Sequence, residues 1–354
     1  MLPIFDGHND VLLRLVRKGE EDGGAASFLH GDGAGQLDLP RARAGGLAGG
    51  LFAVFIPSPE VEPDRGELMQ AAHYDLPLPN GVPMTHAQST ALDMVALLLR
   101  IERRSGGAVR VCRTGADIRD AVATGALATV LHIEGAEPID REFRMLEVLY
   151  GTGLRSLGPV WSRANIFGHG VPFRFPSSPD TGPGLTDEGK ALVMACNELK
   201  VVVDLSHLNE QGFWDVAARS DAPLVASHSN AHALCPHSRN LTDRQLAAIR
   251  ESGGFVGVNF ASGFLRPDGR MLADTPLELL VRHADHLIQQ VGVDGVGFGS
   301  DFDGAIIPAE IKDAAGLPRL LDAFRAAGYD DATLRKLCFE NWVRVLEKSW
   351  RPVS

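Results

Sequence analysis

The sequence is poor in cysteine and lacks any pattern that would tie cysteines together. Its four cysteines (Cys112, Cys196, Cys235 and Cys338) are scattered, and no two of them form a Cys-x-x-Cys pair. This spacing argues against a disulfide framework and against a zinc knuckle, and it is typical of reduced residues in a cytoplasmic protein.

Long apolar runs and an excess of positive charge are also missing. The best membrane candidate, Leu92 to Ile101, is cut by Asp93 and Arg100, so we expect no membrane-spanning segment. Asp6 and Asp10 interrupt the first apolar run, and we expect no signal peptide there. The formal net charge of -11 argues against nucleic acid and against an anionic membrane as partners.

The chain does contain short apolar, β-branched runs that recur along its whole length. They predict eight strands, over 4–6, 51–56, 128–133, 154–160, 201–205, 224–227, 255–260 and 295–299. Helical periodicity predicts helices over 85–104, 186–199, 211–220, 242–252, 276–291 and 333–348. Eight strands with intervening helices in 354 residues favour an α/β fold of the (β/α)8 TIM-barrel type. The alternative is an open, doubly wound sheet.

Two connections are too long to be simple loops. Residues 57–127, after the second strand, contain an insertion rich in Pro, Glu and Met, followed by a helix. Residues 162–184, after the fourth strand, are rich in Gly, Pro, Phe and Ser and are predicted to form an active-site loop. Because no linker divides the chain, we expect residues 1–354 to form one barrel domain with these two insertions.

Histidines and carboxylates stand at the ends of several predicted strands. His207 and His228 end consecutive strands, at the carboxyl edge where α/β enzymes place their chemistry. His8 and Asp10 are two residues apart and can face the same side of the first strand. Glu134 ends an apolar strand, where an unpaired carboxylate would be costly to bury. The Glu134 carboxylate can be interpreted in two ways, as the partner of an arginine in a salt bridge or as a bridge between two metal ions.

Together these residues predict a centre of two zinc-like ions that share Glu134. Each ion would have two further protein ligands and an open position for water, as catalytic zinc sites do. The predicted ligands are His8, Asp10, Glu134, His207 and His228.

An aspartate follows the eighth strand, which runs into Gly299-Ser300-Asp301-Phe302-Asp303-Gly304. Asp301 comes first after the strand, and we predict that it accepts a proton from the nucleophilic water and donates it to the leaving amine. Asp303 has the alternative role of capping the following segment.

Six dispersed motifs resemble those of the renal (membrane) dipeptidase family, the M19 metallopeptidases of the amidohydrolase superfamily. They occur in family order as Asp6-Gly7-His8-Asn9-Asp10, Ile133-Glu134-Gly135, Val203-Asp204-Leu205-Ser206-His207, Ser227-His228-Ser229, Arg239-Asn240 and Gly297-Phe298-Gly299-Ser300-Asp301-Phe302-Asp303-Gly304.

The resemblance implies a (β/α)8 barrel with two zinc ions per chain, bridged by Glu134 and by a water or hydroxide. His8 and Asp10 would complete one ion site, and His207 and His228 the other. A carboxylated lysine, the bridge in other binuclear amidohydrolases, has no counterpart here, because 154–160 contains no lysine.

The resemblance also implies the reaction. It is the hydrolysis of a small dipeptide with a free C-terminal carboxylate, often one with a D-residue at the carboxyl end. Asp301 would be the general acid and base, and Arg239 would bind the carboxylate through its planar guanidinium. Homodimers are common in the family, so a homodimer is an option here.

One position departs from the family, whose fourth strand typically ends Leu-Thr-His. Aligning on Arg155 places Trp161 where that histidine assists at the substrate carbonyl. Trp161 can donate one N–H but cannot carry a proton charge. His169, Arg163 and Asn165 in the following loop are candidates for the missing role. The alternative is a shift of substrate away from ordinary dipeptides.

Three other functions compete with a dipeptidase. An amidohydrolase acting on another small amide, such as an N-acyl amino acid, would use the same centre. A barrel that serves only as a binding protein is disfavoured, because every predicted ligand is present. A sugar-phosphate aldolase or isomerase would need a Gly-rich phosphate loop, whereas Asp301 and Asp303 would repel phosphate.

Overall fold

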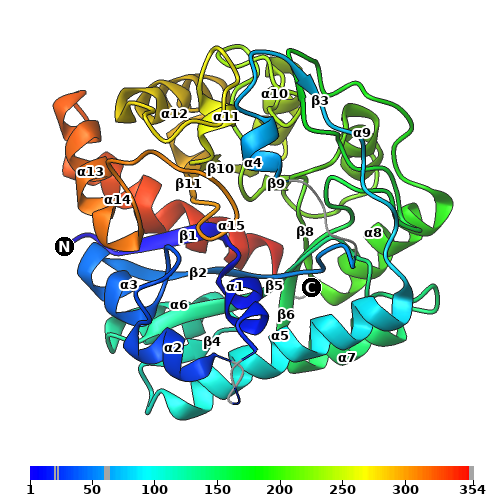
Figure 1. Cartoon of the computed structure of the whole chain (residues 1–354), viewed down its shortest axis with the longest axis horizontal. Helices are drawn as coiled ribbons and strands as arrows, with labels where there is room; N and C mark the ends of the chain where they lie inside the picture. Colours follow the sequence, from blue (N-terminus) through cyan, green and yellow to red (C-terminus); the bar gives the residue numbers. More distant parts are fainter. Residues whose placement is uncertain (20, 22–23, 60–63, 351–354) are drawn as a thin grey trace.

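The computed structural model describes residues 1–19, 21, 24–59 and 64–350, so 60–63 of the predicted insertion and 351–354 of the predicted domain lie outside it. Its centre is a parallel sheet whose eight main strands follow one another in chain order (Figure 1). They are β1 (Ile4–Asn9), β2 (Leu47–Phe55), β5 (Leu127–Glu134), β6 (Leu154–Gly158), β8 (Val202–Val203), β9 (Val225–Ala226), β10 (Phe255–Asn259) and β11 (Val296–Gly299).

The sheet closes on itself into a barrel. β1 pairs with β11, and Asp204, directly after β8, forms a parallel bridge with Val225 of β9. The predicted TIM-type barrel is therefore confirmed, and the open doubly wound alternative is wrong. Strands such as β5 and β10 are nearly continuous apolar runs because both of their faces are buried, one inside the barrel and one under helices.

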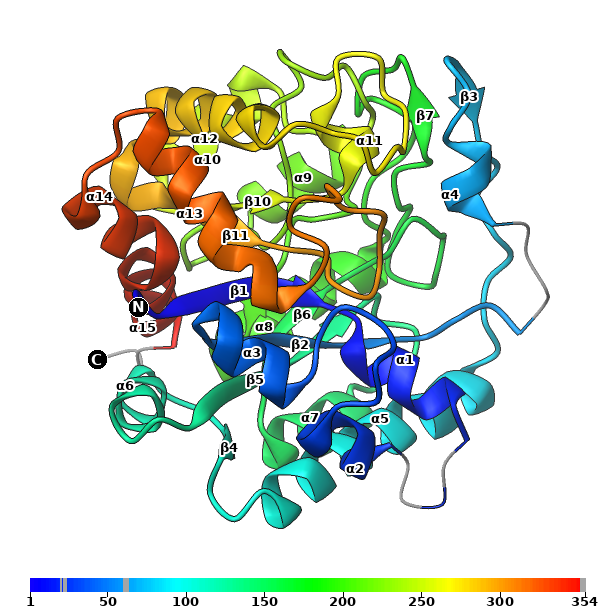
Figure 2. The ribbon, with the colours of Figure 1, turned by 60° about the vertical axis from the view of Figure 1, so that its left-hand side comes forward.

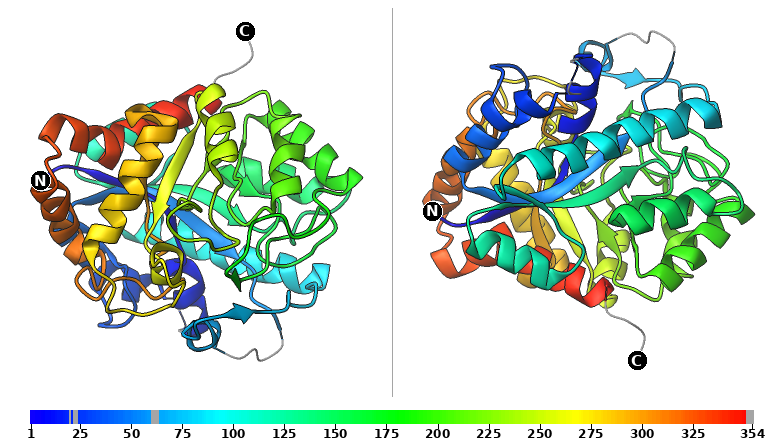
Figure 3. Two further views of the ribbon diagram at one scale, coloured as in Figure 1. Left: turned by 90° about the horizontal axis from the view of Figure 1, so that it is seen from above. Right: turned by 90° about the horizontal axis from the view of Figure 1, so that it is seen from below.

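Helices surround the barrel, as the two views in Figure 3 show. The six predicted helical regions correspond to α5 (Met84–Arg104), α8 (Asp187–Leu199), α9 (Glu210–Ala217), α10 (Asp243–Glu251), α12 (Leu277–Val291), and α14 (Asp331–Arg335) joined by a π-helical segment (Lys336–Glu340) to α15 (Asn341–Ser349). Six further helices in the described residues, each six to ten residues long, were not predicted, because so few turns give only a weak periodic signal. They are α1 (Val11–Arg17), α2 (Ala25–His30), α3 (Leu39–Gly45), α6 (Gly115–Ala123), α7 (Arg144–Thr152) and α13 (Leu317–Ala326).

The two long connections meet each other over one side of the barrel (Figure 2). The first contains α4 (Arg65–Leu68) and β3 (Tyr74–Asp75), and β3 pairs antiparallel with β7 (Arg174–Phe175) of the second. Tyr74 Oη donates to the carbonyl of Gly269 at 2.6 Å and packs in a small apolar cluster of its own. A further short strand, β4 (Val109–Val111), pairs with β5, and α11 (Ser262–Leu265) follows β10. Across the described ranges, the structure has no helix long and apolar enough to cross a membrane.

Candidate metal centre

The five predicted ligands converge at the carboxyl ends of the barrel strands. His8 lies on β1 and Asp10 directly follows it, Glu134 ends β5, and His207 and His228 follow β8 and β9. All five side chains are buried. The barrel thus brings together strand ends that are far apart in the sequence, because parallel strands present the same end at one mouth.

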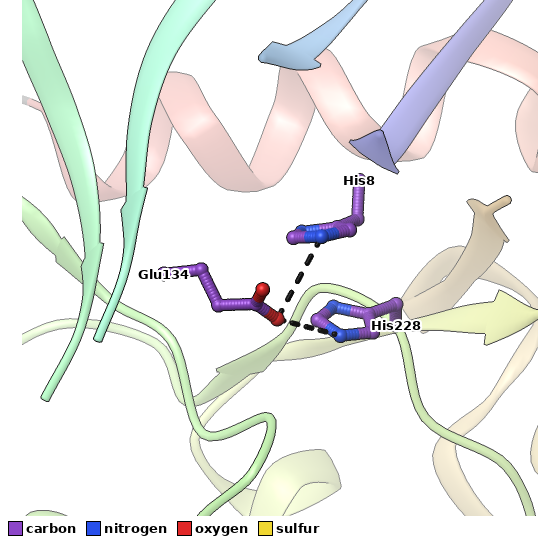
Figure 4. Close-up of side chains that lie close together, drawn as sticks. All are labelled: His8, Glu134 and His228. Carbon is purple, nitrogen blue, oxygen red and sulfur yellow. Dashed lines mark ion pairs between the residues drawn. The ribbon is translucent and has the colours of Figure 1, made fainter. Parts of the chain in front are cut away.

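One carboxylate oxygen forms the middle of this cluster. Glu134 Oε1 lies 2.9 Å from Nε2 of His207, 3.3 Å from Nε2 of His228 and 3.6 Å from Nε2 of His8. Figure 4 shows the Glu134 carboxylate pointing toward both the His8 and the His228 rings. Asp10 Oδ2 lies 3.3 Å from His8 Nε2. The structure therefore directs the Nε2 atoms of three imidazoles toward one shared carboxylate.

The donor set fits metal ions. Asp10 Oδ1 and His8 Nδ1 are buried and have no hydrogen-bond partner within the described ranges. The ligand atoms of His8, Glu134 and His228 lie within 4.8 Å of one another, as do those of His8, Asp10 and Asp301. Imidazole nitrogens and carboxylate oxygens are the ligands that zinc takes in catalytic sites. Both groups contain His8, so His8 lies where it could help to hold an ion.

The electrostatics of the cluster also favour a cation. Burial lowers the pKa of His207 and of His228 well below the usual value, so both rings are neutral, the form that binds metal. Burial opposes a charge on His8, yet the nearby Glu134 and Asp10 raise its pKa to about 10. The carboxylates thus favour a positive charge at this point of the cluster, which a bound cation would supply.

Two residues of the centre have unusual backbone geometry. The φ angles of His207 and Asp301 are 67° and 61°, in the left-handed region that residues other than glycine rarely adopt. Such strain accumulates at functional sites, where the surrounding structure maintains it. The positive φ angles therefore identify His207 and Asp301 as candidate functional residues without reference to their side chains.

Asp301 stands at the edge of the cluster, on the cavity. Its Oδ2 accepts a hydrogen bond from Asn259 Nδ2 at 3.0 Å, and burial raises the pKa of its carboxyl. Sequence reasoning missed Asn259, although an asparagine ending the apolar strand 255–260 was the available signal. Asp303 instead forms an ion pair with Arg14 at 3.2 Å and accepts from the Gln36 backbone N–H.

A cavity of about 600 Å³ opens above the centre. Glu134, His207, Asp10 and Asp301 line its floor, and its walls include Phe55, Trp161, Phe173 and Phe264. The Trp161 ring lies 5.8 Å from the His207 ring, and the Arg65 guanidinium lies 4.5 Å from the centre of the Trp161 ring. The position that departs from the family thus contributes an aromatic wall beside His207.

Of the three residues offered as substitutes for the family histidine, none lines this cavity. His169 is half-buried in the loop after β6. Arg163 is fully buried and paired with Glu137 at 2.9 Å, and Asn165 Nδ2 donates to the Pro159 carbonyl. The contacts of Arg163 and Asn165 join the loop to the barrel.

Arg239 lies beside Phe264, one of the residues that line the cavity. Its guanidinium is buried 5.5 Å from the ring centre of Phe264, and Nη2 donates to the His228 carbonyl at 3.2 Å. Its Nε has no hydrogen-bond partner in the described part of the chain. An unpartnered, buried cationic donor beside a cavity residue suits an anionic group of a ligand.

Comparisons with known proteins agree with this geometry. The model of the membrane dipeptidase family, peptidase family M19, matches residues 1–351. A metallopeptidase from Rhodobacter sphaeroides, in complex with a phosphinate mimic of the dipeptide L-Ala-D-Ala, is 55% identical with a TM-score of 0.96, over 99% of both chains. Dipeptidase AC, a metallopeptidase of family M19, is 56% identical with the same TM-score and coverage. An uncharacterized protein of Klebsiella pneumoniae is 54% identical over 73% of this chain and 95% of its own length.

Proposed function

Since the chain belongs to the membrane dipeptidase family, peptidase family M19, and is a metallo-dipeptidase, we propose that it hydrolyses dipeptides with a free C-terminal carboxylate at a centre of two zinc ions. The observation that carries this proposal is the convergence of three imidazole Nε2 atoms on Glu134 Oε1 in the floor of an open cavity. The L-Ala-D-Ala mimic in the Rhodobacter sphaeroides relative supports L-Xaa-D-Xaa dipeptides as substrates.

In this proposal Glu134 would be shared by the two ions. His8 and Asp10 would help to hold one ion, and His207 and His228 would help to hold the other. When bound, the ions supply Lewis acidity that lowers the pKa of a water molecule and polarises the scissile carbonyl. The neutral imidazoles of His207 and His228 beside the buried Glu134 carboxylate support this assignment.

The other residues of the cavity handle the proton and the substrate. Asp301 takes a proton from the attacking water and returns it to the amine nitrogen as the C–N bond breaks. Its hydrogen bond from Asn259 orients the carboxylate for this transfer. Arg239 binds the substrate carboxylate, and Trp161 excludes water beside the scissile bond with its apolar ring.

Metal analysis and a substrate panel test the proposal together. We expect close to two zinc-like ions per purified chain and rapid cleavage of L-Ala-D-Ala. One ion or none would contradict the binuclear centre. The panel includes L,L-dipeptides and N-acyl amino acids, because the aromatic wall at Trp161 also suits an acyl chain. Preferential cleavage of N-acyl amino acids would replace the dipeptide by that second substrate class.

Arg239→Met is expected to weaken the use of substrates with a free carboxylate. Removing one partner of a buried charge pair costs about 2 kcal/mol or more, so kcat/KM for a free dipeptide falls roughly 30-fold or more. The same dipeptide as its C-terminal amide has no carboxylate to lose, and its kcat/KM changes little. Arg244→Met, on an exposed side chain over Trp214, is the matched control and leaves both substrates unaffected. If the native enzyme cleaves amides as well as free dipeptides, Arg239 has another role.

A further inference from the structure

A chain of hydrogen-bonded side chains lies behind the proposed ligand His228. His228 Nδ1 lies 2.7 Å from Ser227 Oγ, and the Ser227 hydroxyl donates to Asp204 Oδ2. An ionised carboxylate can only accept hydrogen bonds, so the Ser227 hydroxyl donates its hydrogen bond to Asp204 and accepts one from the N–H of His228 Nδ1. The lone pair of His228 is therefore on Nε2, the atom that lies 3.3 Å from Glu134 Oε1.

Asp204 is itself fixed in place. It is buried, and its Oδ1 accepts from the backbone N–H of Ser227 at 2.8 Å and of Ser206 at 3.1 Å. His132 Nε2 lies 3.7 Å from its other oxygen. Both carboxylate oxygens are thus engaged, and Oδ2 is held toward the Ser227 hydroxyl.

The backbone of Ser227 is also held tightly, because three strands approach it. Gly7 on β1, Gly257 on β10 and Gly299 on β11 all face the Ser227 carbonyl oxygen, and a Cβ at any of the three would clash with it. Only glycine permits this close approach. The serine between Asp204 and His228 therefore has little freedom to move.

The other two histidines of the centre are supported differently. His207 Nδ1 lies 2.8 Å from Ser162 Oγ, in the loop after β6. His8 Nδ1 has no hydrogen-bond partner among the residues that the structure describes. The carboxylate-backed chain belongs to His228.

We infer that Asp204 is a positioning residue, which acts through Ser227 to keep His228 in its metal-binding tautomer and so retains the ion of the His207–His228 half. This inference rests on the two-ion centre proposed above. Partners that orient a ligating histidine in this way typically contribute 10- to 100-fold to metal affinity.

The isosteric variant Asp204→Asn tests this series of hydrogen bonds from Asp204 through Ser227 to His228, because it reverses their donor-to-acceptor direction. Its amide nitrogen would donate to Ser227 Oγ, the serine proton would turn to His228 Nδ1, and the remaining imidazole proton would occupy Nε2. We expect one of the two ions to bind about 10- to 100-fold more weakly in competition with a chelator. Ser227→Ala removes the hydroxyl that links Asp204 to His228 without adding a donor, and it should weaken the binding of the same ion.

Cobalt substitution gives a readout that lost stability alone does not change. The visible spectrum of the cobalt enzyme reports the ligands of each ion, and both variants should alter the band of the weakened ion. Ser252→Ala is the matched control, because Ser252 Oγ accepts from the Leu224 N–H at the opposite end of the same strand, β9. This control should lower the Tm and leave both cobalt bands and both affinities as in the wild type.

If Asp204→Asn and Ser227→Ala both kept the metal affinities and cobalt spectra of the wild type, the inference would be overturned. Equal loss of metal from the Ser252→Ala control would overturn it as well. The number of ions bound by the wild type tests the proposed binuclear centre separately from the role of Asp204. Fewer than two ions in the wild type would contradict the binuclear centre. The difference in metal affinity between the wild type and the variants tests the role of Asp204 and Ser227.

Discussion

Glu134→Gln is expected to remove at least one of the two ions and to lower kcat/KM by roughly 10³-fold or more, because the Lewis acidity of a bound ion contributes several kcal/mol. The neutral amide cannot bridge two cations with two anionic oxygens. It would also leave three imidazole nitrogens around one uncharged group, at the distances of 2.9, 3.3 and 3.6 Å that now surround the carboxylate oxygen. Metal content by elemental analysis and steady-state rates on L-Ala-D-Ala measure the two effects.

Glu137→Gln is the matched control for this variant. Glu137 is also a buried carboxylate just beyond β5, but its partner is Arg163 at 2.9 Å and it is not among the cavity-lining residues. Weakening a buried ion pair costs stability, up to about 3–5 kcal/mol when one partner is removed outright. The control should therefore lower the Tm and retain both ions. Two retained ions and near-native turnover in Glu134→Gln would contradict the bridging role.

Asp301→Asn is expected to keep both ions and to lower kcat by about 10²- to 10⁴-fold, the usual contribution of a general acid and base. Asparagine suits the test because it tolerates the left-handed backbone conformation at this position, where φ is 61°. It has the size of aspartate and can still accept from Asn259 Nδ2 through its amide oxygen. The variant therefore removes the proton acceptor while changing little else.

The neighbouring Asp303→Asn variant controls for the shared geometry. Its φ is 65°, but its carboxylate pairs with Arg14 and accepts from the Gln36 N–H. We expect it to lower the Tm and to change kcat far less than Asp301→Asn does. An Asp301→Asn enzyme with near-native kcat would assign the proton transfer to another group. Loss of metal from that variant would make Asp301 a ligand instead.

The sequence determined the barrel and the residue types of the centre. Strands of a parallel barrel are buried on both faces, so each one appears as an apolar run that ends where a polar residue follows. His207, His228 and Glu134 stand out because each polar side chain closes such a run. Local patterns of this kind need no knowledge of the tertiary contacts, which is why the eight strands and the order of the strand-end residues could be predicted.

Only the tertiary structure decided which atoms meet. No local pattern relates Asn259 to Asp301, Arg163 to Glu137, or β3 of one insertion to β7 of the other. Arg163 could be offered as a substrate residue from the sequence alone, yet the fold pairs it in the interior with Glu137. Trp161 could be aligned with a histidine, yet only the tertiary structure shows that Arg65 and His207 pack near its ring. Such contacts depend on side-chain directions across the closed barrel, which the order of residues along one strand does not contain.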